Sequence, residues 1–496
     1  MPPFACIITK SFARIFAAFI LKGLWGIGLM FCCHQGIAQS ADTIAAPQVL
    51  TDTVPKIVLD SVKVLGNKRT RKYIILREMK IKPGDSIPSV HLLDKLKESQ
   101  ELIYNSNLFS DVTLTPVFTT ARRMNIVVTV KERWYIYPSP QFQITDRNYN
   151  EWINTYNANL NRVVYGIKFA HYNVSGRRDQ LRIYVLNGFS RNFSASYSSP
   201  YSNRKLTEGF SVLAGFTQSR DVTYKTSSHN KPIRYSIPNR SFVRSHFNMG
   251  ASYLRRKGYF RRHLFSLIYQ HYNVVDSITS FYNPQYYLNG NRSHLTVPDM
   301  SYTFQYQRTN NINYPLTGKN WGLQLHKRGL GWSGKSNMLQ LTAGYNRYYA
   351  LGKHWYQSVN VIGNMKLPFK QSYINQAAMG YGEYYLRGLE NYVIDGVMSG
   401  IAKYTLRKRV ISFDIPVPIK NPVISKIPFQ IYAKAYGDAG YMYQKFGAAT
   451  KLGNKMLYSG GAGIDLLSLY DTNISLEYSF NQLGQKGLFL HLKGGF

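Results

Sequence analysis

The feature that most constrains the fold is an alternation of apolar and polar residues that recurs in segments from Trp134 to the end of the chain. In one such segment, serine and glutamate residues alternate with four apolar residues: Ile474, Leu476, Tyr478 and Phe480. A period of two is typical of a β-strand whose faces meet two different environments. At about 10 residues per strand plus turns and loops, the region has room for roughly 16 antiparallel strands.

The composition indicates that one of these environments is lipid. After residue 40 no stretch approaches 18 consecutive apolar residues, yet 44% of the chain is hydrophobic and it contains 40 Tyr, 26 Phe and 6 Trp. A membrane helix needs about 20 apolar residues. The strands of a membrane barrel instead alternate lipid-facing apolar with lumen-facing polar residues, and they carry aromatic girdles at the interfaces. We therefore predict a closed all-β transmembrane β-barrel over residues 134–496.

The first 38 residues have the pattern of a signal peptide. Lys10, Arg14 and Lys22 occur without an acidic residue, an apolar stretch follows, and the sequence GIA at 36–38 fits cleavage before Gln39. A retained anchor helix is the alternative, but its apolar run would be shorter than a membrane span. All three cysteines lie in this segment: Cys6, Cys32 and Cys33. The mature chain is therefore expected to contain neither a disulfide nor a thiolate metal site.

Residues 39–56 lack periodicity and are predicted to be a flexible leader. The region 57–133 is predicted to form a small α/β domain in the order β-α-α-β-β. Three strands are expected, which would form a three-stranded sheet: 57–65, 108–116 and 124–132. The first helix is expected to be capped by Thr70. The second, from about 89 to 104, is expected to have four apolar residues on one face: Leu92, Leu93, Leu96 and Ile103.

This order of elements is that of a POTRA domain, the polypeptide-transport-associated module, and five short motifs resemble its landmarks. They are VLGN at 64–67, RE at 77–78, KPGD at 82–85, YN to LF at 104–109, and VKER at 130–133. One such motif would be weak evidence, but five in the right order are specific. Residues 57–133 are therefore predicted to be a POTRA-like periplasmic domain.

Two segments of the barrel region resemble the BamA/TamA-type family of outer-membrane assembly and translocation proteins, the bacterial surface antigen barrels. The sequence YLRGL at 385–389 resembles the tip of a long loop that folds into the lumen, and YGDAG at 436–440 resembles the strand motif that receives it. Softer similarities to the early barrel hairpins occur at 173–177 and 199–201. The resemblance extends over residues 57–496.

The resemblance implies a lumen contact between Arg387 and Asp438. Alternation along 429–441 places Tyr436 and Asp438 on the lumen face. A carboxylate shielded from solvent there would favour a bidentate guanidinium partner. Gly388 would let the loop turn, and Gly440 would leave room for the approaching backbone. The alternative is that the arginine is an ordinary loop residue and the aspartate a solvated lumen residue.

The chain departs from the family pattern at Thr405, where the family commonly has glutamate, which puts a three-way Arg-Glu-Asp lumen network in doubt. The terminal aromatic residue, Phe496, resembles the C-terminal assembly signal of outer-membrane proteins.

Charge and motifs provide no evidence for an enzyme. The formal net charge is +36, but the basic residues are dispersed, so lipid phosphates or acidic client segments are expected as partners and nucleic acid is not. The alternative is that the charges lie on solvated loops and in a polar lumen, and composition does not separate these readings. The sequence GLGWSG at 329–334 matches a dinucleotide fingerprint literally, but it precedes an alternating strand and is predicted to be a hairpin loop. No catalytic elbow, zinc-binding helix or phosphate-binding loop occurs, and the 11 His residues do not pair with carboxylates at ligand spacing. We expect no catalytic residue, cofactor or metal.

The predicted function is outer-membrane protein assembly, or translocation through the barrel. Unfolded outer-membrane or secreted proteins would bind the periplasmic domain by strand addition, and accessory periplasmic proteins are further candidate partners. The resemblance implies that the barrel opens between its first and last strands. Two alternatives stay open: a passive channel or structural barrel, and a barrel-embedded lipid hydrolase with a serine and a histidine far apart in sequence.

Overall fold

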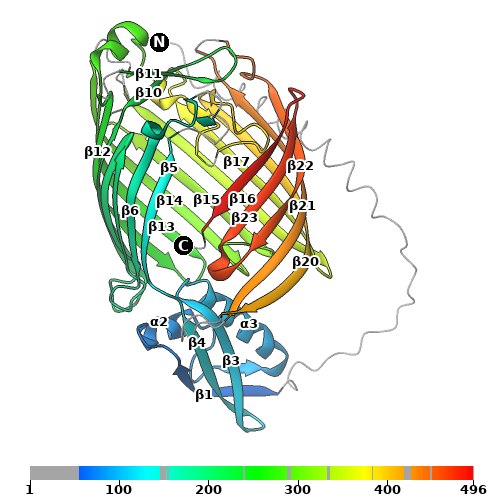
Figure 1. The fold of residues 1–496 in the computed structure, drawn as a ribbon. Coiled ribbons are helices and arrows are strands. Elements are labelled where there is room, and N and C mark those ends of the chain that lie inside the picture. The colour runs from blue at the N-terminus through cyan, green and yellow to red at the C-terminus, as the bar shows by residue number, and fades with distance from the viewer. Residues whose placement is uncertain are drawn as a thin grey trace, which may run out of the picture. The chain divides into compact units, whose positions relative to one another are not determined.

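The computed structural model describes residues 55–494 except 146–151, 154–155, 238–240, 288–291, 332–335, 383, 418–425 and 447–448. The described part of the chain consists of a small α/β domain followed by a large curved β-sheet (Figure 1). None of its helices has the length and apolar character needed to cross a membrane. The predicted signal peptide and almost all of the predicted leader lie outside the described residues.

The α/β domain has the strand order β2-β1-β4-β3. Its elements are β1 (Lys56–Leu65), α2 (Lys72–Glu78), β2 (Ser86–Pro88), a 3₁₀ turn (Ser89–His91), α3 (Leu92–Tyr104), β3 (Phe109–Thr120) and β4 (Arg123–Glu132). Strand β1 runs parallel to β4, and β3 runs antiparallel to it. A register shift between Leu59 and Ser61 marks the point where the alternation of the first strand slips. The interior is aliphatic, with Leu59, Ile87 and Val128 fully buried.

Three details of this domain differ from the predictions. The sheet has four strands, because Ser86–Pro88 pairs with the start of β1. Thr70 does not cap α2, since the N-cap is Arg71, and the Thr70 hydroxyl lies 3.1 Å from that of Tyr135. Leu93 is 76% exposed, because the buried face of α3 passes through Leu92, Leu96, Ser99, Leu102 and Ile103 instead.

The large sheet contains sixteen strands, each antiparallel to its neighbours, and it curves into a barrel (Figure 1). They are β5 (Ile136–Ile144), β6 (Val163–Tyr172), β7 (Gln180–Gly188), β8 (Ser190–Ser199), β9 (Glu208–Ser219), β12 (Arg244–Lys257), β13 (Arg261–Val274), β14 (His294–Thr309), β15 (Gly318–Arg328), β16 (Met338–Gly352), β17 (Trp355–Leu367), β20 (Met398–Pro416), β21 (Lys426–Tyr443), β22 (Met456–Leu467), β23 (Asn473–Asn481) and β24 (Lys486–Lys493). Short hairpin strands lie in the loops, namely β10 (Asp221–Thr226) with β11 (Pro232–Ser236) and β18 (Ala377–Met379) with β19 (Ile394–Asp395). The prediction of about 16 antiparallel strands is confirmed.

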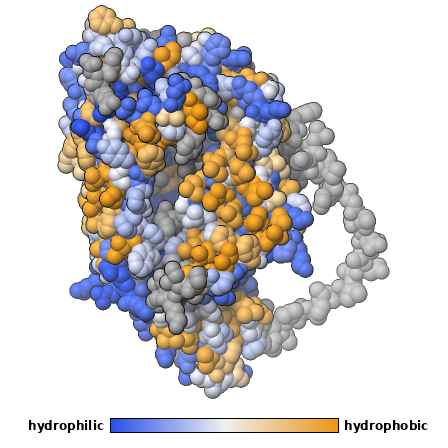
Figure 2. Space-filling model, viewed as in Figure 1, coloured by the Kyte–Doolittle hydropathy of each residue, from blue (hydrophilic) through white to orange (hydrophobic). Residues whose placement is uncertain are grey.

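The barrel wall is apolar outside and polar inside. On β23 the outward residues Leu476 and Tyr478 are 41% and 48% exposed, whereas the inward Glu477 is 4% exposed. This is the reverse of a water-soluble sheet, in which the apolar face is buried. Figure 2 shows hydrophobic residues gathered on the outer face over the last strands. The segment 329–337 joins β15 to antiparallel β16, as expected of a hairpin loop, although 332–335 lie outside the described residues.

The expected closure of the wall is incomplete. The sheet order begins at β24 and ends at β5, and no pairing joins these two strands within the described residues. Strand β5 contains Pro138 and Pro140, which lack a backbone N–H donor and are typical of an edge strand. Strand β24 has only 8 residues, so it offers few groups for pairing.

Buried ion pairs hold the α/β domain against the turns of the barrel. Glu78 on α2 accepts two hydrogen bonds from the guanidinium of Arg256, at 2.6 and 2.7 Å, and one from the Tyr201 hydroxyl at 2.7 Å. Arg133, just after β4, lies 3.2 Å from Asp471 in the turn between β22 and β23. The domain is therefore fixed to the end of β12 and to the turns that follow β8 and β22.

The electrostatic state of Glu78 follows from these contacts. Burial by itself would raise the pKa of this carboxyl group, but Arg256 and then Arg77 outweigh burial and lower the pKa to about 2. The carboxylate is therefore charged at neutral pH, and its charge is compensated inside the contact.

Candidate functional site

The candidate site is built around the segment between β17 and β20, which packs against lumen-facing residues of the wall. Its apolar side chains share a buried cluster with residues of β20, β21, β22 and the segment between β21 and β22: Ala378, Met379, Leu386, Leu389, Tyr392, Ile394, Ile401, Met442, Leu452 and Leu457. Figure 1 shows this segment in yellow, near the end of the barrel opposite the α/β domain. The packing holds the polar residues at its tip against β21.

Arg387 and Asp438 lie in direct contact. The guanidinium donates from Nε to Oδ2 at 2.9 Å and from Nη2 to Oδ1 at 2.5 Å, so the pair is bidentate. The backbone N–H of Arg387 also donates to Oδ2, at 3.1 Å. The two side chains are 10% and 0% exposed. Charge-assisted bidentate bonds of this kind fix both position and orientation.

Three further groups complete the environment of Arg387. Its Nη1 donates to the Thr405 hydroxyl at 3.1 Å, and its Nη2 donates to the carbonyl oxygen of Tyr404 at 3.3 Å. Its Cζ lies 3.9 Å from the ring centroid of Tyr436, within cation–π range. Thr405 therefore takes part in the network as a neutral acceptor, at the position where the family resemblance would have a carboxylate.

The two glycines of the predicted site have different surroundings. Gly388 has φ +84°, a conformation that favours glycine, and a Cβ added there would lie 2.9 Å from that of Ser479. A Cβ on Gly440 would lie 3.0 Å from Leu386 Cδ1 and 3.2 Å from Met379 Cε. The groups that approach Gly440 from the loop are thus side chains, whereas the sequence predicted backbone. Phe496 lies outside the described residues.

Sequence reasoning missed a second group of charges next to this contact. Lys434 on β21 forms ion pairs with Asp465 on β22 and with Glu477 on β23. His491 on β24 lies between Glu477 and Glu390 of the loop. These residues come from five segments of the chain, and only the strand register brings them together. The alternation of each strand was the one available signal, because it places the four strand residues on the lumen side.

The fold and the contact between Arg387 and Asp438 define a class of protein: a POTRA-type domain followed by a barrel of sixteen described strands, with a loop packed against lumen-facing residues. Residues 57–133 match the family model described as POTRA, surface antigen variable number repeat. This match confirms the predicted POTRA domain. No curated protein sequence matches the chain.

Three solved structures are similar to the chain. CdiB from Escherichia coli has a TM-score of 0.52 and 12% identity, with 88% of this chain and 75% of that chain covered. BamA from Haemophilus ducreyi lacking POTRA domains 1-3 has a TM-score of 0.47 and 13% identity, with 88% and 83% covered. CdiB from Acinetobacter baumannii has a TM-score of 0.44 and 13% identity, with 88% and 73% covered. The first of these shows that the chain shares the fold of CdiB, which bears out the predicted architecture.

Proposed function

We propose that this protein assembles other proteins into the bacterial outer membrane or translocates them across it. The observation that carries the proposal is the arrangement of the POTRA domain, which is fixed to the barrel by buried ion pairs and has β3 at the edge of its sheet. An open sheet edge can accept an extended chain by strand addition. A firmly docked domain would deliver that chain to a constant position at the barrel.

The apolar outer wall supports an outer-membrane location. The outward residues of β24 are large and exposed: Leu488, Leu490 and Leu492. Exposed apolar area of this extent is stable in lipid, where a barrel satisfies its backbone hydrogen bonds within the sheet. In this proposal residues 1–38 act as the export signal and the POTRA domain lies in the periplasm.

Strand β3 is the proposed client site. Within the described sheet it pairs only with β4, and its distal part exposes Val117 and Phe118, at 46% and 54%. Main-chain hydrogen bonds would supply affinity for any extended segment, and the apolar side chains would favour segments with apolar alternation. Unfolded outer-membrane strands and secreted β-rich proteins have this pattern.

The proposed role of the contact between Arg387 and Asp438 is to hold the inward loop in place while a client passes. No catalytic group is required, because burial of apolar strands and closure of sheet edges can drive insertion. The edge strands β5 and β24, which do not pair with each other in the described sheet, are the proposed place where the wall opens.

Photo-crosslinking in living cells tests the client site. A crosslinking residue at Val117 should capture unfolded outer-membrane or secreted proteins. The same residue at Leu93, on the exposed face of α3 in the same domain, should not. Equal capture at both positions, or no capture at Val117, would contradict the proposal.

A passive channel is the competing function, and a deletion distinguishes the two. A variant without residues 39–133 should lose assembly or secretion activity if the proposal is correct. An open, selective pore in channel recordings, with no assembly or secretion defect in a deletion strain, would favour the passive channel instead.

A further inference from the structure

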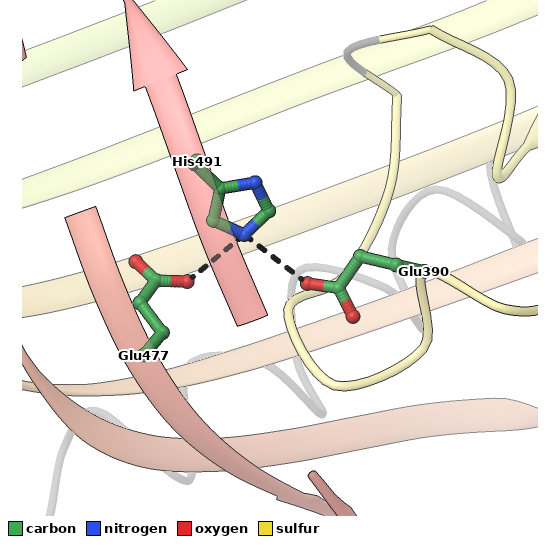
Figure 3. Close-up of side chains that lie close together, drawn as sticks. All are labelled: Glu390, Glu477 and His491. Atoms are coloured by element: carbon green, nitrogen blue, oxygen red, sulfur yellow. Dashed lines mark ion pairs between the residues drawn. The ribbon is translucent and has the colours of Figure 1, made fainter. Parts of the chain in front are cut away.

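Three potential metal ligands meet near the loop contact. His491 of β24 lies between the carboxylates of Glu477 on β23 and Glu390 on the loop, and both carboxylates point toward its ring (Figure 3). Its Nε2 is 3.4 Å from Glu477 Oε2 and 3.7 Å from Glu390 Oε1. One ligand atom from each residue lies within 4.8 Å of the other two.

These separations are longer than hydrogen bonds. A charged N–H···O bond to a carboxylate usually measures 2.7–2.9 Å, which is shorter than either of these separations. With metal–ligand bonds of 2.0–2.1 Å, neighbouring ligand atoms in a tetrahedral zinc site lie about 3.3 Å apart. The distance from His491 to Glu477 has this value, and the distance to Glu390 exceeds it by a few tenths of an ångström.

The surroundings of Glu477 provide a second, independent observation. The residue is 4% exposed. Lys434 contacts its Oε1 at 2.6 Å, so the other oxygen, Oε2, points at His491. That oxygen is buried and accepts no hydrogen bond within the described structure. Burial of a carboxylate oxygen without a hydrogen-bond donor costs free energy unless a cation lies against that oxygen.

We propose that Glu390, Glu477 and His491 form a binding site for a divalent transition-metal ion of the zinc type. Two carboxylates and a neutral imidazole are ligands that such ions accept. The side chains of His491 and Glu390 are 24% and 16% exposed, so water from the lumen can reach the fourth position. Tyr385 stacks near the imidazole, with ring centroids 5.8 Å apart, which helps to orient it.

A metal here would join the inward loop to the last strand of the barrel. Glu390 is three residues after Arg387, while His491 lies on β24, the strand that has no partner on its outer side in the described sheet. The ion would therefore restrain an edge strand whose backbone pairs only with β23 in the described sheet. Metal occupancy would change how readily β24 separates from the loop.

Zinc binding to the full chain tests this proposal. The protein is purified from membranes in detergent without a histidine tag, equilibrated with Zn²⁺ at neutral pH, and its bound metal is measured by mass spectrometry. We expect about one zinc ion per chain, removable by a chelator. Glu390→Gln and His491→Gln should each weaken binding by more than about 100-fold, because loss of a mere outer-shell partner costs 10–100-fold.

His326→Gln is the matched control. His326 also faces a carboxylate, Asp299, at 3.4 Å, but it belongs to no cluster of three such groups in the described structure. This variant should bind zinc as the parent does. Heat-dependent migration on gels verifies that each variant is folded. Because Glu390→Gln changes a loop residue, this variant still tests the proposal if His491→Gln fails to fold. Absence of stoichiometric zinc, or binding unchanged in folded Glu390→Gln, would overturn the proposal.

Discussion

The buried pair of Arg387 and Asp438 makes the stability of the protein sensitive to single substitutions. Its desolvation is compensated only while both partners and the surrounding hydrogen bonds are present. Removal of one partner leaves an uncompensated buried charge, which typically costs 3–5 kcal/mol. The loop position therefore depends on both residues as a unit.

A double-mutant cycle tests this dependence. Arg387→Ala and Asp438→Ala should each destabilise the protein by about 3–5 kcal/mol in urea unfolding and impair its activity, and the double variant should be little worse than either. The control is Asp414→Ala, which breaks an exposed pair with Lys426 at 3.8 Å and should cost at most about 1 kcal/mol. If the losses of stability in the double variant were the sum of the two single losses, the proposed coupling would be contradicted.

We predict from the lowered pKa of Glu78 that docking of the POTRA domain depends on pH. Its pKa in the folded protein, about 2, lies below the ordinary value of 4.5. The carboxylate therefore stabilises docking above about pH 4.5, by about 3 kcal/mol, and this contribution is lost as the pH falls toward 2. Hydrogen exchange of the α2 amides, corrected for intrinsic rates, should show parent protein better protected than Glu78→Gln at pH 7. The difference should shrink below pH 4.5, and a constant difference would contradict the assignment.

At the scale of residues, the sequence predicted only the contact whose two partners lie in recognisable local motifs. The motifs around Arg387 and Asp438 pointed to a contact because each lies in a recognisable segment. The partnership of Glu78 with Arg256 could not be predicted, because it depends on how the domain docks. The cluster of Glu390, Glu477 and His491 depends on the register of β24 against β23 and on how the loop packs, which no pattern along one strand specifies.

At the scale of elements, the alternation predicted the wall well because lipid and lumen enforce a period of two on every strand. Strand β23 has the faces expected, with Leu476 outside and Glu477 inside. The errors fell in the α/β domain. Short β2 has too few residues for a detectable pattern, and Thr70 lost its capping role to tertiary hydrogen bonds with Tyr135 and Asn173.

Substitutions on β23 should reflect this alternation. Leu476→Arg places a charge on the lipid-facing side and should destabilise the barrel in lipid by about 2–4 kcal/mol if it lies near the bilayer midplane. Leu93→Arg, on the exposed face of α3, should change stability by less than about 0.5 kcal/mol. Urea unfolding in lipid vesicles measures both. A Leu476→Arg protein as stable as the parent would argue against a lipid-facing wall.

At the scale of the whole molecule, the protein combines a docked POTRA domain with a barrel that has an apolar outer wall and a polar lumen. The order of domains was readable from the sequence because each has its own periodicity. The open edges of β5 and β24 in the described sheet were implied only by the family resemblance, since an incomplete closure arises from the geometry of all sixteen strands together. Prolines Pro138 and Pro140 were the only local indication.

The most direct test of the central claim, that this wall faces lipid outside and a polar lumen inside, is fluorescence quenching along β23. In a protein whose native cysteines are replaced, single cysteines at six consecutive positions, 474–479, are labelled with a fluorophore in vesicles that contain brominated lipid chains. The account predicts strong quenching at Ile474, Leu476 and Tyr478 and weak quenching at the three positions between and after them. Equal quenching on both faces, or none on either, would contradict it.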